Sequence, residues 1–249
     1  MCIRDSDKGI QCTNSSQPLI NGNVFYNRNV DLNIIICNDS SPRILRNRIY
    51  GGEGTGTAIQ CTGCPDIEIL NNIVEIPDEH STGIKLNSCS GVKVINNTLN
   101  INGVGIKEGG SSTQIMNNII VGENSQKLDV SDLSVLSYND LWDYATGVGD
   151  TIIGIGNIYQ DPLFVDMSGG DYHLREGSPC IDAGNPDPQY NDADGSRNDM
   201  GAYGGPMPTR PPLFRPEAPW WCLLLWHPRA RSSPFPLTVV LYQALPILK

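Results

Sequence analysis

Short apolar runs broken by an asparagine recur along residues 20–120, as in ILNNIV at 69–74. Subtracting the positions of successive asparagines gives separations of 24, 25, 25 and 21 residues. The five asparagines that define the repeat are Asn23, Asn47, Asn72, Asn97 and Asn118. An apolar residue lies three positions before and two positions after each of them. A spacing of this size, kept over five copies, indicates a repeat protein.

A column of isoleucines stands thirteen residues before the first four asparagines and twelve before the last. Its members are Ile10, Ile34, Ile59, Ile84 and Ile106. The period and the short alternating runs predict one β-solenoid turn per repeat, with each strand pairing in parallel with its copy in the next turn. Turns stacked about 4.8 Å apart would bring these isoleucines into contact as an apolar interior.

Paired asparagines are unusual in a strand-like run, because Asn disfavours strands and prefers turns. Stacking explains them, since an amide has both donors and an acceptor and a column of amides can hydrogen-bond from turn to turn. Asn also tolerates the left-handed backbone that suits a bend. We therefore expect the repeat asparagines to form a structural ladder rather than to contact a ligand.

Longer motifs resemble a known family. GIKLNSCSGVKVINNTL at 83–99 is similar to the right-handed parallel β-helix repeat of pectate lyases and many bacterial surface proteins. The segments at 156–166, 170–184 and 192–205, which include SPCIDAG and DMGAY, resemble the end segment of secreted bacterial β-helix proteins that often carry a surface-anchoring domain. The resemblance implies an all-β, right-handed parallel β-helix of about five recognisable turns plus an irregular end segment, located outside the cell or on its surface.

One carboxylate departs from the interior pattern. Glu108 stands two positions after Ile106. The equivalent positions of the other turns hold Cys12, Ile36, Cys61 and Leu86. Burying an unpaired carboxylate is costly, so the last recognisable turn is expected to lose the regular register.

The chain divides into four expected segments. Residues 1–7 begin MCIRDS, which lacks the features of a signal peptide and resembles the translation of a transposon-end sequence used in preparing DNA libraries; a non-native leader is expected. Residues 8–165 are expected to form the β-helix, although the period fails after residue 122. Residues 166–205 are expected to pack over its last turn as a cap. Residues 206–249 form a Pro- and Trp-rich tail, expected to be disordered, for which a native anchor and an unnatural extension both remain open.

The net charge of the chain limits the kinds of molecule that it is expected to bind. The formal net charge is −10, and residues 207–249, with five basic residues and one acidic, contribute +4, which leaves −14 for the rest of the chain. Such an acidic chain disfavours nucleic acid and other polyanions, and it can recruit divalent cations. A membrane or cell-wall contact is expected only through an anchor.

Cysteines do not define a disulfide framework. Cys64 and Cys89 fall in one column of neighbouring turns, where they are either small hydrophobes in contact or a disulfide. Cys61 and Cys64 form a lone Cys-x-x-Cys motif without a second pair or spaced histidines, so zinc binding and redox chemistry are not supported.

Two lysines are the candidate catalytic bases. Lys85 and Lys107 each follow a repeat isoleucine by one residue, which places them outside the solenoid on neighbouring turns. Lyase chemistry of the resembled family uses a basic residue together with a carboxylate cluster that holds calcium. No acidic column stands opposite these lysines within the repeats, and an ordinary solvated face is the simpler explanation for them.

Three aspartates are the candidate metal ligands. Asp192, Asp194 and Asp199 surround Gly195, and their carboxylates could converge on Ca²⁺. A plain Asp-Gly turn, with Arg197 paired to a local carboxylate, explains the same residues.

The resemblance, more than the individual residues, implies a secreted or cell-surface β-helix module that binds polysaccharide or serves as a structural display rod. The alternative is a polysaccharide lyase or glycoside hydrolase acting on uronic-acid-containing glycans. Fold alone does not decide between them.

Overall fold

The computed structural model describes residues 2–4, 9–26, 33–52, 54–122, 128–130, 134–142 and 154–206. The expected leader, apart from residues 2–4, and the expected tail, apart from residue 206, lie outside the described residues. Residues 1–216 form one compact unit, and only this unit is described below. Within its described part, no helix has the length and apolar character needed to cross a membrane.

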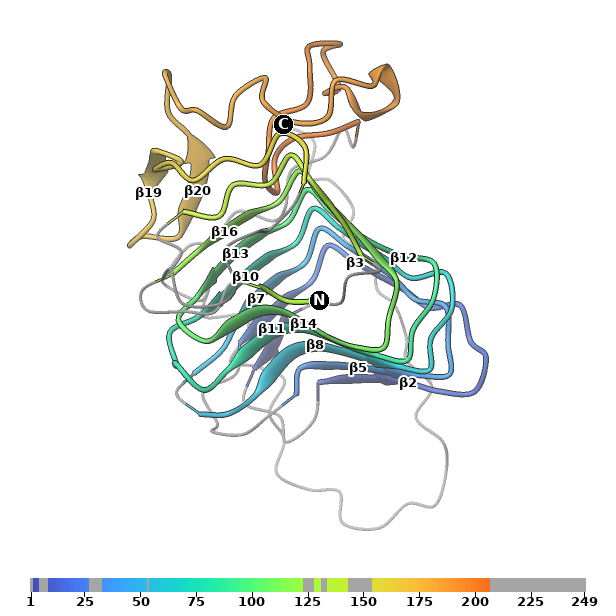
Figure 1. The fold of residues 1–249 in the computed structure, drawn as a ribbon. Coiled ribbons are helices and arrows are strands. Elements are labelled where there is room, and N and C mark those ends of the chain that lie inside the picture. Colours follow the sequence, from blue (N-terminus) through green and yellow to red (C-terminus); the bar gives the residue numbers. More distant parts are fainter. Residues whose placement is uncertain are drawn as a thin grey trace, which may run out of the picture. The chain divides into compact units, whose positions relative to one another are not determined.

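Three parallel sheets wind around one interior (Figure 1). Sheet A contains β1 (Cys2–Arg4), β4 (Val24–Tyr26), β7 (Arg48–Tyr50), β10 (Ile73–Ile76), β13 (Thr98–Ile101) and β16 (Ile119–Val121). Sheet B contains β2 (Ile10–Cys12), β5 (Ile35–Asn38), β8 (Thr57–Thr62), β11 (Thr82–Asn87), β14 (Val104–Gly109) and β17 (Leu128–Asp129). Sheet C contains β3 (Leu19–Asn21), β6 (Arg43–Leu45), β9 (Glu68–Leu70), β12 (Val92–Ile95), β15 (Thr113–Met116) and β18 (Val135–Ser137).

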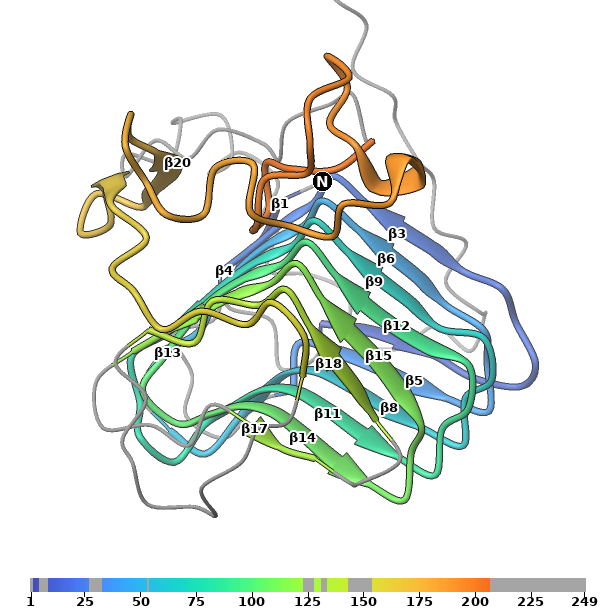
Figure 2. The ribbon, with the colours of Figure 1, turned by 45° about the horizontal axis from the view of Figure 1, so that its top comes forward.

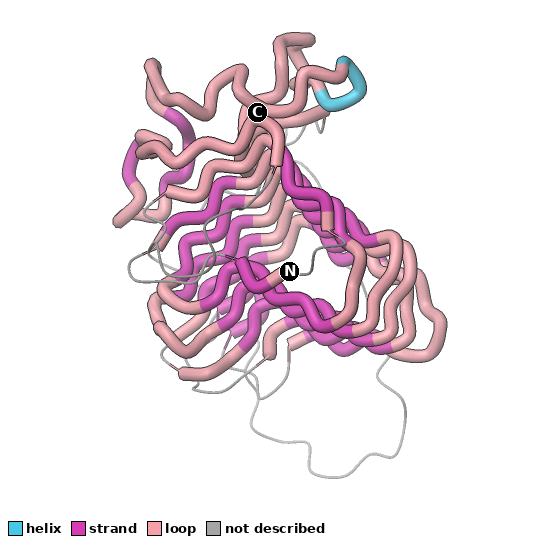
Figure 3. The backbone as a smooth tube through the Cα atoms, viewed as in Figure 1, coloured by secondary structure: helices cyan, strands magenta, loops and turns pink. Residues whose placement is uncertain are grey.

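An irregular end segment follows the solenoid (Figure 2). It contains an antiparallel pair, β19 (Phe164–Asp166) and β20 (Asp171–Leu174), and a 3₁₀ turn at Pro188–Tyr190. That turn is the one helical element among the described residues (Figure 3). The predicted all-β parallel β-helix of about five turns with an irregular end segment is confirmed.

Stacked apolar columns fill the interior as predicted, but the second turn is shifted by one residue. Ile10 pairs with Ile35 and not with Ile34, and Cys12 pairs with Cys37 and not with Ile36. A shift of one residue in a strand exchanges its inward and outward faces. Ile34 and Ile35 are both buried, so hydrophobicity alone could not distinguish them.

The turn that contains Glu108 keeps its register, contrary to expectation. Glu108 pairs with Leu86 in the β11–β14 ladder. Its Oε2 accepts a hydrogen bond from the hydroxyl of Ser134 at 2.6 Å, and the residue is only partly buried. A polar partner in the next turn therefore makes the carboxylate compatible with this column.

The asparagine ladder runs the length of the solenoid. Asn72 shows the pattern: its Oδ1 accepts from the backbone amide and side-chain Nδ2 of Asn47 at 2.9 and 3.0 Å. Its own Nδ2 donates to Oδ1 of Asn97 at 3.0 Å and to the carbonyl of Ile44 at 2.8 Å. The ladder also continues beyond Asn118. The additional members are Asn139 and Asn157.

The residue before each ladder asparagine makes the corner between sheets C and A. These residues have φ values between +53° and +74°, in the left-handed region. Where the sequence is Asn-Asn, the first asparagine supplies this backbone conformation and the second supplies the ladder amide. The corner residues with a side chain are Arg46, Asn71, Asn96, Asn117 and Tyr138. Each of the two adjacent asparagines therefore has its own structural role, one in the bend and one in the ladder.

Replacing a ladder asparagine tests its contribution. Asn72→Ala and Asn97→Ala are each expected to lower the free energy of unfolding by about 1–3 kcal/mol, because neighbouring buried polar groups lose their partners. Urea denaturation followed by circular dichroism measures this change. Gln11→Ala removes an exposed amide and serves as the control. Unchanged stability in both ladder variants would contradict a stabilising ladder.

Candidate functional site

The end segment is held along the corner between sheets C and A. Three corner asparagines that do not belong to the ladder hydrogen-bond its backbone. Asn71 Nδ2 donates to the carbonyl of Gly204 at 2.7 Å, Asn96 Nδ2 to that of Asp199 at 2.9 Å, and Asn117 Oδ1 accepts from the amide of Asn185 at 2.8 Å. These contacts reach three successive turns, whereas packing over the last turn was expected. The end segment therefore lies along the flank of the solenoid.

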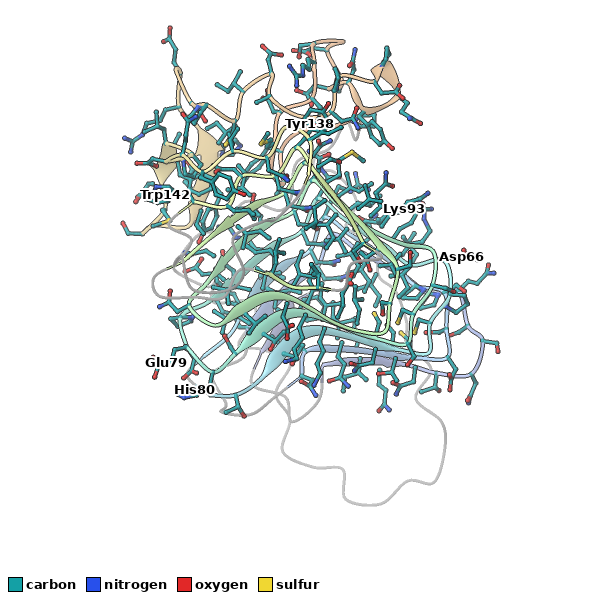
Figure 4. The ribbon with its side chains drawn as sticks, viewed as in Figure 1. Asp66, Glu79, His80, Lys93, Tyr138 and Trp142 are labelled. Atoms are coloured by element: carbon teal, nitrogen blue, oxygen red, sulfur yellow. The ribbon has the colours of Figure 1, made fainter. Side chains whose placement is uncertain are left out.

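An apolar cluster completes this attachment. Side chains on the outer face of sheet A pack against the end segment. The buried members are Ile73, Ile119, Val121, Phe164, Tyr172, Cys180, Met200 and Ala202. Trp142 packs at the margin of this cluster, and Figure 4 labels it on the side of the molecule where the β19–β20 pair is drawn. Because the end segment packs against the outer face of sheet A, it forms one side of any hollow on that face.

A buried carboxyl of the solenoid meets a buried thiol of the end segment. Cys180 Sγ donates to Oδ2 of Asp140 at 3.1 Å, and the amide of Gln160 donates to Oδ1 at 3.2 Å. Burial raises the pKa of Asp140 to about 7 despite these hydrogen bonds. The carboxyl is therefore protonated in the folded protein below neutral pH.

A cleft of about 320 Å³ opens where sheet A meets the end segment. Its lining residues are Glu75, Pro77, Asn100, Asn102, Val121, Gly122, Trp142 and Met167. One carboxylate, two amides and an indole thus face one hollow. This size is near the lower limit for small-ligand pockets, and the mixture of polar and apolar groups is typical of them.

Glu75 is held at the cleft by a polar network. The hydroxyl of Tyr172 donates to its Oε2 at 2.9 Å and accepts from Asn100 Nδ2 at 2.9 Å. The buried guanidinium of Arg48 lies 5.8 Å from the centre of the Tyr172 ring and donates to the carbonyl of Gly170. Burial raises the pKa of Glu75, while the Tyr172 hydrogen bond and Arg48 act in the opposite direction. The network fixes the position of the carboxylate.

Aromatic rings continue the Glu75 column toward the first turns. Tyr26, Tyr50 and Glu75 are in register on the outer face of sheet A. The rings of Tyr26 and Tyr50 are stacked with centroids 4.9 Å apart. Parallel pairing thus extends the outer face beyond the cleft as a line of large side chains.

The two candidate lysines are neighbours but lie on another sheet. Lys85 and Lys107 are in register on β11 and β14 of sheet B. Lys107 Nζ forms an ion pair with Oδ2 of Asp129 at 2.9 Å. Neither lysine lines the cleft. A catalytic role for them stays a prediction.

The three candidate calcium ligands use their oxygens to hold the backbone. Asp192 accepts from the amides of Asp199 and Gly205, and Asp199 accepts from the amide of Asp182. Asp194 accepts from the amide and hydroxyl of Ser196, which lowers its pKa. Arg197 donates to backbone carbonyls of residues 183 and 184. The carboxylates therefore build turns of the end segment.

Cysteines form a continuous run inside the solenoid. Cys12, Cys37 and Cys61 are in register in sheet B, and all are free thiols, as are Cys64 and Cys89. Neighbouring thiols in the order Cys12, Cys37, Cys61, Cys64 and Cys89 shift one another's pKa values, with Cys12, Cys61 and Cys89 raised and Cys37 and Cys64 lowered. Hydrogen bonds from Cys12 and Cys61 lower the pKa of Cys37 to about 4, and the hydrogen bond from Cys61 lowers that of Cys64 to about 6. Two hypotheses were open for Cys64 and Cys89, a simple contact or a disulfide, and both residues are free thiols in the structure.

Three parallel sheets, an internal amide ladder and a cleft on an outer face define a parallel β-helix protein with a ligand-sized hollow. The chain belongs to the family described as Periplasmic copper-binding protein (NosD), which matches residues 2–163. This match covers more than half of the 249 residues but little of the end segment. No curated protein matches the chain. The family is described as periplasmic, which is consistent in broad terms with the predicted location outside the cytoplasm.

The calcium prediction for Asp192, Asp194 and Asp199 is wrong. The family is described as binding copper. Across the described ranges, no group of three His, Cys, Asp or Glu side chains is arranged to hold a metal ion. The aspartate oxygens that could bind Ca²⁺ instead accept hydrogen bonds from nearby backbone amides.

The Asp140–Cys180 pair predicts a pH dependence. Folding raises the pKa of Asp140 from 3.8 to about 7, so the protonated carboxyl stabilises the fold fully below about pH 4 and this contribution is lost as the pH rises to 7. Asp140→Asn is expected to remove a fall of roughly 2–3 kcal/mol in unfolding free energy between pH 5 and 8.

Urea titrations at the two pH values measure this difference. Glu176→Gln, which alters an exposed carboxylate, should keep the wild-type pH dependence. An identical fall in wild type and Asp140→Asn would refute the assignment.

Proposed function

We propose that this chain is a ligand-binding module of the cell envelope that holds a neutral polysaccharide in the cleft between sheet A and the end segment. The lining of the cleft carries the proposal. Glu75, Asn100 and Asn102 offer acceptors and donors to sugar hydroxyls, and Trp142 offers an apolar ring. The acidic charge of the chain disfavours an anionic glycan.

Binding fits the cleft better than cleavage does. Hydrolysis of a glycosidic bond ordinarily uses two carboxyl groups on opposite sides of the bond. The described lining contains one carboxylate, Glu75, and no lysine or arginine. Elimination from a uronate would need a base, and Lys85 and Lys107 lie on a different sheet. The lyase and hydrolase alternatives therefore have no complete set of groups here.

The family description favours a second function, copper binding. One feature of this chain supports it: the interior run of thiols. Thiolates are soft ligands that select Cu(I) over hard cations. The run is chemically separate from the cleft because it lies inside sheet B rather than outside sheet A. The two functions are therefore testable independently.

Calorimetric titration with neutral oligosaccharides from plant and microbial walls tests the first function. The wild-type chain should bind at least one of them, and Trp142→Ala should weaken binding by about tenfold or more, since a buried aromatic contact contributes on the order of 1–2 kcal/mol. Glu75→Gln should weaken it while leaving the fold intact.

Tyr159→Ala is the matched control, because Tyr159 is an aromatic residue that is 52% exposed and does not line the cleft. Reducing-end and ultraviolet assays on the same mixtures detect turnover. Glycan binding that Trp142→Ala leaves unchanged would place the site elsewhere, and product formation would restore the enzyme alternative.

A further inference from the structure

The cysteine run joins two interior columns. Parallel pairing places Cys12, Cys37 and Cys61 in consecutive turns of sheet B, facing inward. Cys64 lies at the next corner, and its sulfur is 3.3 Å from the carbonyl oxygen of Cys37. Cys89 lies at the equivalent corner of the following turn, where Pro65 and the residue after Cys89 form a parallel bridge. Five sulfurs thus follow one another across four turns.

Burial isolates this run from competing ligands. Cys37 and Cys61 are fully buried, and Cys64 and Cys89 are nearly so. Cys12 is only half-buried and forms the exposed end of the run. The hydroxyl of Ser40 lies 3.9 Å from Cys64 Sγ, and the backbone carbonyl oxygens of Cys37 and Thr62 lie 3.3 Å from the same sulfur. The run itself supplies five sulfur atoms, which are soft ligands.

The arrangement selects among thiophilic metals. Zinc and iron–sulfur centres need four ligands that converge on one point. The described residues contain no such convergent group of even three ligands. Cu(I) differs, because this ion accepts two thiolates on opposite sides. Neighbouring thiols in a stacked column supply pairs of ligands, each about 4.8 Å apart along the axis.

We propose that the interior thiol run of Cys12, Cys37, Cys61, Cys64 and Cys89 is a Cu(I)-binding site. The proposal rests on the copper function considered above and assigns it to residues. Each bound ion takes two adjacent sulfurs, forms two copper–sulfur bonds and displaces the protons that those sulfurs carry. Copper enters and leaves as Cu(I), so no electron is transferred. Cys12 is half-buried and lies at the end of the run, so the ion first binds there.

Anaerobic titration of the fully reduced full-length chain tests the site. Cu(I) is supplied as its bicinchoninate complex, and transfer to the protein is read from loss of that complex's colour and from the ultraviolet thiolate-to-copper absorption. X-ray absorption of the loaded protein should show sulfur alone in the first coordination shell. Thiol titration before loading confirms that the cysteines are reduced.

The Cu(I) affinities of cysteine variants distinguish a thiol that binds copper from one that only packs in the core. Cys37→Ala and Cys61→Ala should each lower Cu(I) affinity by at least about tenfold. Cys180→Ala removes a buried thiol that bonds Asp140 rather than another cysteine, and its affinity should equal wild type. Cys12→Ala changes the half-buried end, which the fold tolerates best, and should also weaken binding. Circular dichroism establishes that each variant is folded.

The outcomes are distinct. Sulfur-only coordination that Cys37→Ala, Cys61→Ala and Cys12→Ala weaken, but Cys180→Ala does not, supports the site. Tight Cu(I) binding that persists in all three run variants, or a shell of nitrogen and oxygen, would overturn the assignment while leaving copper binding as a function. Failure of the reduced wild-type chain to take Cu(I) from bicinchoninate would overturn both.

Discussion

The corner between sheets C and A is the constraint on which the rest of the molecule depends. Each turn changes direction through a left-handed residue and then buries an amide that bonds both neighbouring turns, as at Asn71 and Asn72. A buried amide that lost its partners would cost about 1–3 kcal/mol, so the ladder penalises any slip of one turn past another. The same corner presents Asn71, Asn96 and Asn117 to the end segment. Register and end-segment attachment therefore have one origin.

A fixed register between turns brings side chains from different repeats together into possible binding sites. Once every turn is aligned, residues many positions apart become neighbours along the axis. Tyr26, Tyr50 and Glu75 align in this way on the outside of sheet A, and Cys12, Cys37 and Cys61 align on the inside of sheet B. The end segment then converts one part of the outer face into a cleft. The inner site needs only the stacked turns, whereas the outer site needs both the turns and the segment that lies against them.

The repeating features were predictable from sequence, and the features that depend on single loops or distant contacts were not. The ladder from Asn23 to Asn118 follows from its spacing. Asn139 was missed although it keeps the 21-residue separation of Asn97 and Asn118, and Asn157 follows at a shorter separation of 18 residues. Ile34 was placed in the column of Ile35 because two adjacent buried isoleucines look alike in sequence. The cleft joins residues of the solenoid to Trp142 and Met167. No local pattern encodes that meeting. The calcium prediction failed because carboxylates that stabilise turns have the same spacing as carboxylates that bind a cation.

The thiol run also has a cost in stability that bears on its role. Leu86 occupies the same column as Cys61 in the next turn and is fully buried, so at that level the column accommodates a larger apolar side chain. A cysteine there buries less apolar surface than leucine, a difference of about 1 kcal/mol or more for each position. A column under selection for packing alone would be expected to hold aliphatic residues, as the Ile59 and Ile84 column does. Three successive cysteines lack that stabilisation, which is consistent with the proposed role of their sulfur atoms in binding Cu(I).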